Sequence, residues 1–414
     1  MDREQERALI DGLIRRVVDE CPRRQATSES ERRAQDIVRG VLEAEGLSTH
    51  LHSFEFNDNI HENFVLHFGL GTLGTLLSGV APRTAFALHA GSAASYWAES
   101  TRRAYVLRRL LGFKSSQNLI GVLPAEGEPS LRIVFIAHID AAFTGLAFDS
   151  RVISVAHGQP PFGLRSLKRP IAFATRAQVA LAGIDLLRSV VGPFAWPLRP
   201  LEFLLTLPSA MIFLFNLEIL VRNEMVAGAN DDLTGVACLP VLASRLANKP
   251  SDVELVFVAS GAEETSLGGA DALARDMGGT WDKDKTVIIA LDTLSLGELL
   301  FIETEGEVVR TPIPAWLRDV VVDVAGSDER FSGVHGFEPP LGGTDAAAFL
   351  AHGWNAVALT CIDPALGTAG NYHQPSDTPD SLNLDQVLLA VDFAERLAER
   401  LIERRAVRPT PPTS

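Results

Sequence analysis

The sequence predicts an α/β fold: a mixed, mostly parallel central sheet with helices on both faces, carrying two apolar insertions. Two observations support this prediction. Four short runs are apolar almost throughout, as expected for strands buried on both faces, and they span 131–140, 253–260, 286–292 and 355–361. Helical patterns separate these runs, and strands that alternate with helices are typical of a sheet covered on both sides.

The predicted elements follow one another in a regular order along the chain. The first helix is expected at about 30–45, where Ser28 and Glu31 have the spacing of a capping box and Gly46 is a suitable stop. Residues 47–56 alternate between apolar and polar side chains, which predicts a strand. The remaining helices are expected at about 234–246, 267–277, 345–351 and 384–405.

Composition and charge narrow the class of protein. The chain has 414 residues, 46% of them hydrophobic, and a formal net charge of -15, which argues against a general nucleic-acid binder. Its three cysteines, Cys21, Cys238 and Cys361, are far apart, so neither a disulfide framework nor a cysteine-type zinc site is expected. The charged N-terminal segment lacks the apolar core of a signal peptide, and we expect a cytoplasmic location.

Polar residues close the apolar runs or lie in the loops between elements. The candidates are His138, Asp140, Asp231, Glu263, Glu264, Asp292 and His373. Ligand sites in α/β sheets lie beyond the carboxyl ends of the strands, so we expect these residues to meet at one edge. Imidazoles and carboxylates without cysteine suit zinc, manganese or cobalt rather than copper(I) or an iron–sulfur cluster.

Two adjacent carboxylates can have different functions when they lie at a metal site. Two metal ions about 3.5–4 Å apart need a shared anionic ligand, which one aspartate can supply. Of the neighbours Glu263 and Glu264, one can then bind metal while the other takes a proton from water. In His138-x-Asp140, the intervening residue returns Asp140 to the same side of the strand, where it can orient the imidazole. Taken alone, the pair Asp231–Asp232 is better interpreted as a helix N-cap than as a metal ligand.

Six motifs follow one another in the order His138-x-Asp140, "GANDDLTG", "GAEETSLGG", "LDTLS", "GGTDAAAF" and "YHQPSDT". This order and spacing resemble the di-zinc aminopeptidase family that includes bacterial leucyl aminopeptidase, Streptomyces aminopeptidase and aminopeptidase Y. The resembling parts cover roughly 27–60, 116–140 and 226–405. The resemblance implies a zinc-exopeptidase fold and an enzyme that releases N-terminal residues from a peptide or small amide substrate.

The resemblance also implies a ligand set for two divalent ions, most simply zinc, with manganese or cobalt as alternatives. It assigns His138, Asp231 and Asp292 to one ion. It assigns Asp231, Glu264 and His373 to the other, so that Asp231 bridges the two.

The remaining roles come from the same resemblance. Glu263 would be the general base and acid, Asp140 would orient His138, and Tyr372 would help to hold the oxyanion of the tetrahedral intermediate. Two positions depart from the usual family pattern: Ile139 stands where a tyrosine is common, and residues 344–346 read Thr-Asp-Ala where Ser-Asp-His is common. These departures weaken any statement about the preferred substrate residue.

Other functions stay open at this stage. The carboxypeptidase and deacylase group, which acts on N-acylated substrates, shares the ligand order. It normally carries a dimerisation domain between the fourth and fifth ligands, where this chain has only 81 residues. A glutaminyl-cyclase-like transferase uses one metal, and a non-catalytic scaffold with this fold should lack ligands or the base. The complete ligand set argues against both.

Two stretches depart from the alternation and are predicted to be insertions into a single catalytic domain of residues 1–405, with a disordered tail after it at 406–414. They lie at about 63–114 and 141–222, and the second separates His138 from Asp231. The section from Arg83 to Pro200 has fourteen Lys and Arg against six Asp and Glu, a local charge of +8.

Three interpretations of the insertions compete. Residues 63–82 are uncharged and, as a helix, would rise about 30 Å, enough to span a membrane, with flanking arginines that suit an anionic leaflet. Against this, residues 203–217 are only 15 long and include Pro208. The insertions could instead lie on a membrane surface or cap the site as an apolar lid. An apolar rim around the site would favour a hydrophobic substrate. The insertions could also form a homo-oligomer interface.

Overall fold

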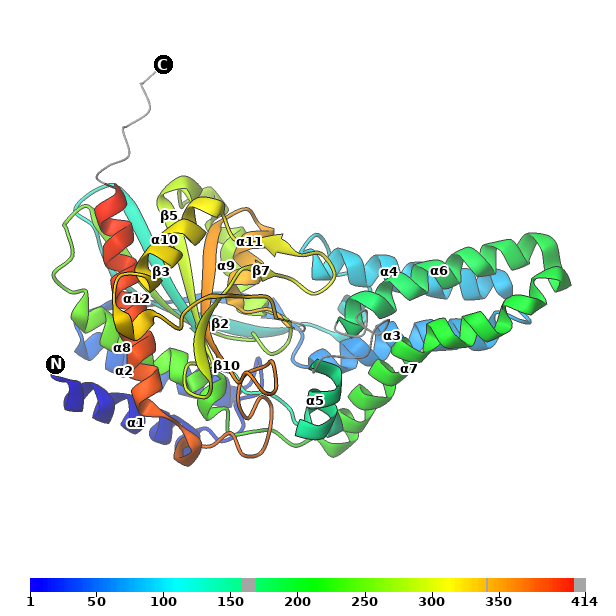
Figure 1. Ribbon diagram of the computed structural model, residues 1–414, viewed down its shortest axis with the longest axis horizontal. Helices are drawn as coiled ribbons and strands as arrows, with labels where there is room; N and C mark the ends of the chain where they lie inside the picture. Colours follow the sequence, from blue (N-terminus) through cyan, green and yellow to red (C-terminus); the bar gives the residue numbers. More distant parts are fainter. Residues whose placement is uncertain (158–168, 340–341, 406–414) are drawn as a thin grey trace, which may run out of the picture.

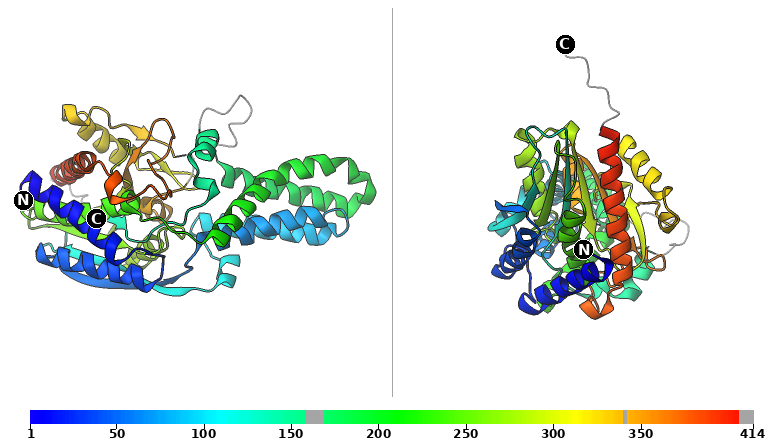
Figure 2. Two further views of the ribbon diagram at one scale, coloured as in Figure 1. Left: turned by 90° about the horizontal axis from the view of Figure 1, so that it is seen from below. Right: turned by 90° about the vertical axis from the view of Figure 1, so that its left-hand side faces the viewer.

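The computed structural model describes residues 1–157, 169–339 and 342–405. The predicted tail at 406–414 and part of the second insertion, 158–168, lie outside the described residues. The described chain has two parts, an α/β body and a helical arm that projects from it (Figure 1). The arm is equally distinct in the view from below (Figure 2).

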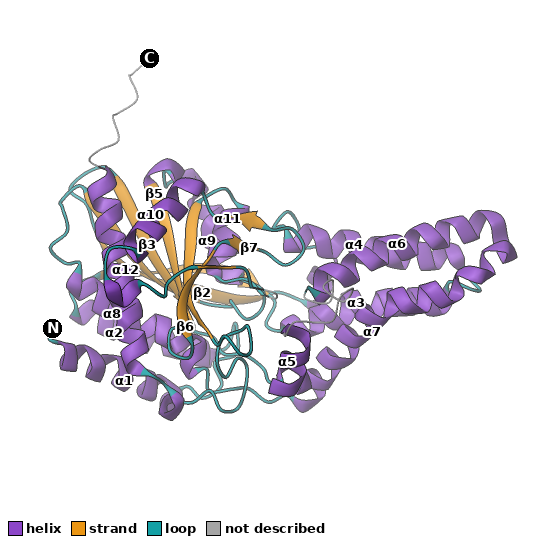
Figure 3. Cartoon of the chain, in the orientation of Figure 1, coloured by secondary structure: helices purple, strands orange, loops and turns teal. Residues whose placement is uncertain are grey.

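The described residues of the body form an eight-stranded sheet in the order β1-β2-β4-β3-β5-β10-β6-β9 (Figure 3). The strands are β1 Ser48–Phe56, β2 Lys114–Leu123, β3 Leu131–His138, β4 Val253–Ser260, β5 Thr286–Asp292, β6 Glu298–Ile302, β9 Gly336–Phe337 and β10 Asn355–Ile362. The four central strands β4, β3, β5 and β10 are parallel to one another. Strand β2 pairs antiparallel with β1 and β4, β6 pairs antiparallel with β10, and β9 pairs parallel with β6. The predicted mixed, mostly parallel sheet is therefore confirmed.

Helices cover both faces of this sheet. Helix α8 (Thr234–Arg245) packs on β3, β4 and β5, and it is in turn covered by α1 (Arg3–Glu20), α2 (Glu29–Ala44) and α12 (Leu384–Arg405). The other face carries α9 (Gly268–Asp276) and α11 (Asp345–Ala351), and α10 (Ala315–Ala325) packs beside α12. A small second sheet pairs β7 (Thr304–Glu305) with β8 (Thr311–Pro312).

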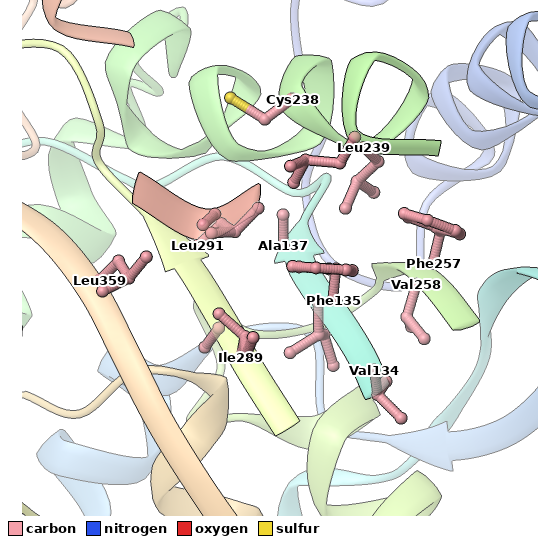
Figure 4. Packing of buried hydrophobic residues seen from close by; sticks show 14 of the residues in the cluster. Val134, Phe135, Ala137, Cys238, Leu239, Phe257, Val258, Ile289, Leu291 and Leu359 are labelled. Carbon is pink, nitrogen blue, oxygen red and sulfur yellow. The ribbon is translucent and has the colours of Figure 1, made fainter. Parts of the chain in front are cut away.

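The apolar runs become strands because both of their faces are buried. All eight residues of β3 are buried, and the ring of Phe135 stacks on that of Phe257 from β4 with centroids 5.4 Å apart (Figure 4). Fully burying one such side chain contributes about 1.5–3 kcal/mol. Cys238 and Cys361 are buried in the same core, in keeping with packing roles. The core therefore holds the strand ends in fixed positions.

Ser28 caps α2 as predicted, but Glu31 does not complete the capping box. Ser28 Oγ accepts the main-chain N–H of Glu31 at 3.2 Å. The Glu31 carboxylate instead accepts the N–H groups of Thr27 and Ala262 at 2.9 and 2.8 Å. Ala262 precedes Glu263, so this buried side chain ties α2 to the loop that carries the two glutamates.

The two insertions come together as a four-helix arm. The first insertion supplies α3 (Ile60–Leu77) and α4 (Pro82–Ser100), and the second supplies α6 (Pro170–Val191) and α7 (Arg199–Arg222). Helix α3 packs along α4 and α7, and α6 packs along the same two helices, so the four stand at the corners of a square. The shorter α5 (Ser150–His157) lies at the base of the arm, beside the body (Figure 1).

Candidate metal centre

The predicted site residues lie together at one edge of the sheet. His138 is the last residue of β3 and Asp292 is the last residue of β5, while Glu263 and Glu264 lie in the loop that follows β4. Because β4, β3 and β5 are parallel neighbours, their carboxyl ends meet at the same edge. Three separate apolar runs thus deliver their closing polar residues to one place.

Asp231 reaches this edge from the loop between α7 and α8. The carboxylate of Asp377 accepts the main-chain N–H groups of Asn230 at 2.6 Å and Asp231 at 3.2 Å. The carboxylate of Asp232, which follows a cis peptide bond, accepts the N–H groups of His138 and Thr293 at 3.2 and 3.0 Å. The loop is therefore fixed from both sides by buried carboxylates.

The carboxylate of Asp231 lies between the two histidines. Its Oδ1 is 3.1 Å from His138 Nε2, and its Oδ2 is 3.3 Å from His373 Nε2. Glu264 Oε2 is also 3.3 Å from His373 Nε2. Ligand atoms within 4.8 Å of one another form one group from His138, Asp231 and Asp292, and a second from Asp231, Glu264 and His373. The two groups share Asp231.

A third group of the same kind joins His138, Glu263 and Glu264. Glu263 Oε2 is 3.8 Å from His138 Nε2, so the presumed base stands beside both ligand groups rather than inside either.

The donor set fits divalent cations. Asp231 Oδ2 and Glu264 Oε1 are buried side-chain oxygens without a hydrogen-bond partner among the described residues. Such an unpaired buried atom costs about 1–3 kcal/mol. A cation ligated by these oxygens and by the imidazole nitrogens would remove that cost, and the oxygen and nitrogen donors match zinc.

The pKa shifts of the site residues also favour a cation site. Burial, with Glu264 adding to it, raises the pKa of Glu263 well above its usual range, against the opposing effect of His138. Burial and the carboxylate of Asp231 raise the pKa of Asp292 to about 7. For His138, burial lowers the pKa, but Glu263, Asp140 and Asp231 outweigh it and the pKa is raised. Cations ligated by these groups would favour their deprotonated forms.

Asp140 positions two parts of the site at once. Its carboxylate oxygens accept the main-chain N–H groups of Glu263 and Glu264 at 3.1 and 3.0 Å. Nδ1 of His138 lies 3.2 Å from the main-chain oxygen of Asp140 and 3.5 Å from its carboxylate. The imidazole is therefore oriented largely through the backbone of Asp140, while its side chain holds the glutamate loop.

Two adjoining cavities lead to these residues. The inner one, of about 100 Å³, is lined by both histidines and all the candidate carboxylate ligands. The outer one, of about 350 Å³, shares Glu263, Glu264, Tyr372 and His373 with it and extends to the base of the arm. Tyr372 stacks on the His373 ring with centroids 3.9 Å apart, so it lies beside the site.

Several residues at the site were not singled out from the sequence. The ring of Phe148, from the second insertion, lies 4.5 Å from the His373 ring between centroids. Phe143 and His61 line the outer cavity and contact each other edge to face. Asp377 lies within the quoted motif "YHQPSDT", but spacing alone does not reveal its hydrogen bonds to the Asp231 loop. The insertions thus contribute side chains to the site.

Comparison with known proteins agrees with this arrangement. Residues 217–396 match the model of the family described as Peptidase family M28. The alkaline phosphatase isozyme conversion protein of Escherichia coli K12 is 29% identical over 160 residues, which cover 37% of this chain. The match spans about half of that relative's length, 46%.

Solved structures resemble almost the whole chain. A zinc aminopeptidase from Bacillus subtilis superimposes with a TM-score of 0.53 at 13% identity, covering 95% of this chain and 94% of its own. A glutaminyl cyclase from an Acidobacteriales bacterium superimposes with a TM-score of 0.54 at 14% identity, covering 96% and 95%. These likenesses show the fold of the chain.

The stability of the metal-free protein should fall as pH rises from about 5 to 8. The folded-state pKa values of His138, Glu263, Glu264 and Asp292 are raised, so the stability they contribute at low pH is lost as pH rises through those values. The lowered pKa of Asp231 acts only at more acidic pH. Calorimetric melting of chelator-treated protein at several pH values measures this.

Zinc should reverse that trend, because its ligands bind deprotonated. The zinc-induced rise in Tm should therefore be larger at pH 8 than at pH 5. A zinc effect that is equal at both pH values, or absent, would contradict the assigned ligand set.

Replacing Asp377 with Asn should weaken zinc binding about 10–100-fold, as for other residues that orient metal ligands. The amide has only one oxygen to accept the N–H groups of Asn230 and Asp231, so the Asp231 loop loses a contact. The affinity is measured by competition with a zinc-binding dye. The control Asp380→Asn, at an exposed position in the same segment, should leave the zinc affinity unchanged. If both variants lowered the affinity equally, Asp377 would not have the proposed role in positioning the Asp231 loop.

Proposed function

We propose that this protein is a metal-dependent hydrolase of peptide or amide bonds, and specifically a di-zinc aminopeptidase. The observation that carries the proposal is the position of Asp231, whose two oxygens face two imidazoles and belong to both ligand groups. Glu263 stands beside these groups and lines both cavities. The match to a peptidase family supports the same reaction class.

The chain's residues divide the reaction between them. Zinc ions held by the two ligand groups would supply Lewis acidity and lower the pKa of water in the site. The Glu263 carboxylate takes a proton from the attacking water and delivers it to the nitrogen of the leaving amine. The Asp140 carboxylate keeps Glu263 in place by accepting the main-chain N–H of Glu263. The water attacks directly, so no covalent intermediate with the protein is required.

The outer cavity supports a substrate with an apolar side chain. Phe64, Phe143, Phe148 and Ile171 line it on the side of the arm. Its volume of about 350 Å³ suits one or two residues of a peptide. Tyr372, which also lines it, is placed to help hold the oxyanion of the tetrahedral intermediate.

The substitution Glu263→Gln should lower kcat for aminoacyl amides by about 10²–10⁴-fold, the usual contribution of a general base. Zinc content should be unchanged, since Glu263 lies outside the two assigned ligand groups. The exposed Glu298→Gln, on β6, is the matched control and should retain full activity.

The substrate panel separates the related functions. The assay compares aminoacyl amides, their N-acetylated forms and peptides that begin with glutamine. Preference for the free amine supports the aminopeptidase. Preference for the acetylated forms would indicate a deacylase, and release of ammonia from the glutamine peptides a cyclase. Full activity of the Glu263→Gln protein would show that the base is assigned wrongly.

A further inference from the structure

The four-helix arm has its polar residues inside. Between residues 177 and 217 the charged side chains are those of Asp185, Arg188, Arg199 and Glu202. Asp185 and Glu202 are 1% exposed and Arg188 is 6% exposed, and the side chain of Arg199 is 16% exposed. They pair with one another inside the bundle, Glu202 with both arginines, and Asp185 with a histidine of α4.

Hydrogen bonds between polar side chains continue down the interior of the arm. His89 Nδ1 lies 2.6 Å from Asp185 Oδ2, and the hydroxyls of Thr75 and Thr206 are 2.6 Å apart. Closer to the body, further pairs join the helices: His67 with Ser95, Gln178 with Ser209, and His61 with Asn216. These polar contacts join the helices in addition to the apolar cluster of Phe68, Tyr96 and Ala174 inside the arm.

The outside of the arm is apolar on all four helices. Its exposed large hydrophobic residues are Leu73, Leu76, Phe86, Trp97, Val179, Leu186, Leu187, Val190, Leu201, Phe203, Leu204, Leu207, Met211, Leu214, Leu217 and Val221. Leu204 is 61% exposed and Val190 is 78% exposed. Among the described residues from 63 to 98, Arg83 is the one exposed charged residue. Soluble proteins rarely expose a continuous apolar surface of this extent.

A bilayer covers such a surface better than a second copy of the chain does. Because the helices stand at the corners of a square, their outward faces point in four directions. A second copy would bury one or two of these faces and leave the rest in water. Lipid surrounds all four, and polar contacts between helices are typical of bundles in lipid.

The length of the arm matches a bilayer. The four helices have 18, 19, 22 and 24 residues, or about 27–36 Å at 1.5 Å per residue, against about 30 Å of hydrocarbon. Two segments, Pro170–Val191 and Trp196–Arg222, are long and apolar enough to cross, with 44% and 28% of their most apolar windows buried. Helices α3 and α4 form one hairpin and α6 and α7 form another. Both hairpins return to the α/β body, so the body stays on one side of the bilayer.

The ends of the arm carry residues that favour the membrane interface. Trp196, 67% exposed, and Arg83 lie at the far end, at the turns between the helices of each hairpin. At the base, Trp97 is exposed and the guanidinium of Arg103 lies 4.8 Å from its ring centroid. Tryptophan is enriched at both interfaces of a membrane, and arginine near a helix end can extend its charged group to the interface.

We propose that the arm inserts into a lipid bilayer and holds the metal site at the membrane surface. The outer cavity opens at the base of the arm, where His61, Phe64 and Ile171 of its helices line it. A peptide segment at the membrane surface therefore has direct access to the site. This proposal does not depend on the reaction that the site performs.

The test uses the full-length protein in vesicles of phosphatidylcholine and phosphatidylglycerol. The wild type should float with the vesicles through a density gradient, also at high salt. The double variant Leu204→Glu/Leu214→Glu should lose at least about tenfold in vesicle binding, because charges on lipid-facing helices oppose insertion. The matched control Leu51→Glu/Val322→Glu, at exposed apolar positions of β1 and α10 in the body, should float like the wild type.

A second measurement does not depend on how the glutamate variants fold. Phosphatidylcholine brominated on its acyl chains should quench part of the wild-type tryptophan fluorescence, and the conservative Trp196→Phe change should remove much of that quenching. A wild type that stays at the bottom of the gradient as a defined oligomer, with no bromine quenching, would overturn the proposal. Failure of the Glu263→Gln test would leave this result untouched.

Discussion

The carboxylate of Asp231, held between the imidazoles of His138 and His373, is the interaction on which the rest of the site depends. Glu263 is buried beside it, and Glu264 and Asp292 are partly buried, so the negative charge of the site exceeds what two histidines can neutralise. Burying unpaired charge is costly, and the raised pKa of these carboxyls expresses that cost. Divalent cations ligated by these carboxylates and imidazoles would remove that cost.

Several separate elements of the fold position the site residues. Parallel strands deliver His138 and Asp292 to one edge, where Asp140 fixes the glutamate loop by two main-chain hydrogen bonds. Asp377 holds the Asp231 loop in the same way, and Glu31 adds a further hydrogen bond to the glutamate loop. The arm adds apolar side chains to the outer cavity. The metal centre is thus a joint product of the buried sheet and of the insertions.

Much of the body could be predicted because its strands are short apolar runs with both faces buried, and β4 and β5 have the predicted limits. The site residues could be singled out because each closes such a run or lies in a motif with glycine or proline. The supporting carboxylates could not, since Glu31 looks like a capping residue and bonds instead to the N–H of Ala262. The inward position of the arm's polar side chains could not be predicted either, because composition does not say which face of a helix points inward.

The central claim, that Asp231 is shared by two cations, is tested most directly by counting zinc per chain. Native mass spectrometry of the zinc-loaded protein, with Asp231→Asn measured beside it, gives the number without reference to any substrate. We expect two ions per wild-type chain and fewer than two in the variant. A single ion in the wild type, or two ions retained by the variant, would contradict it.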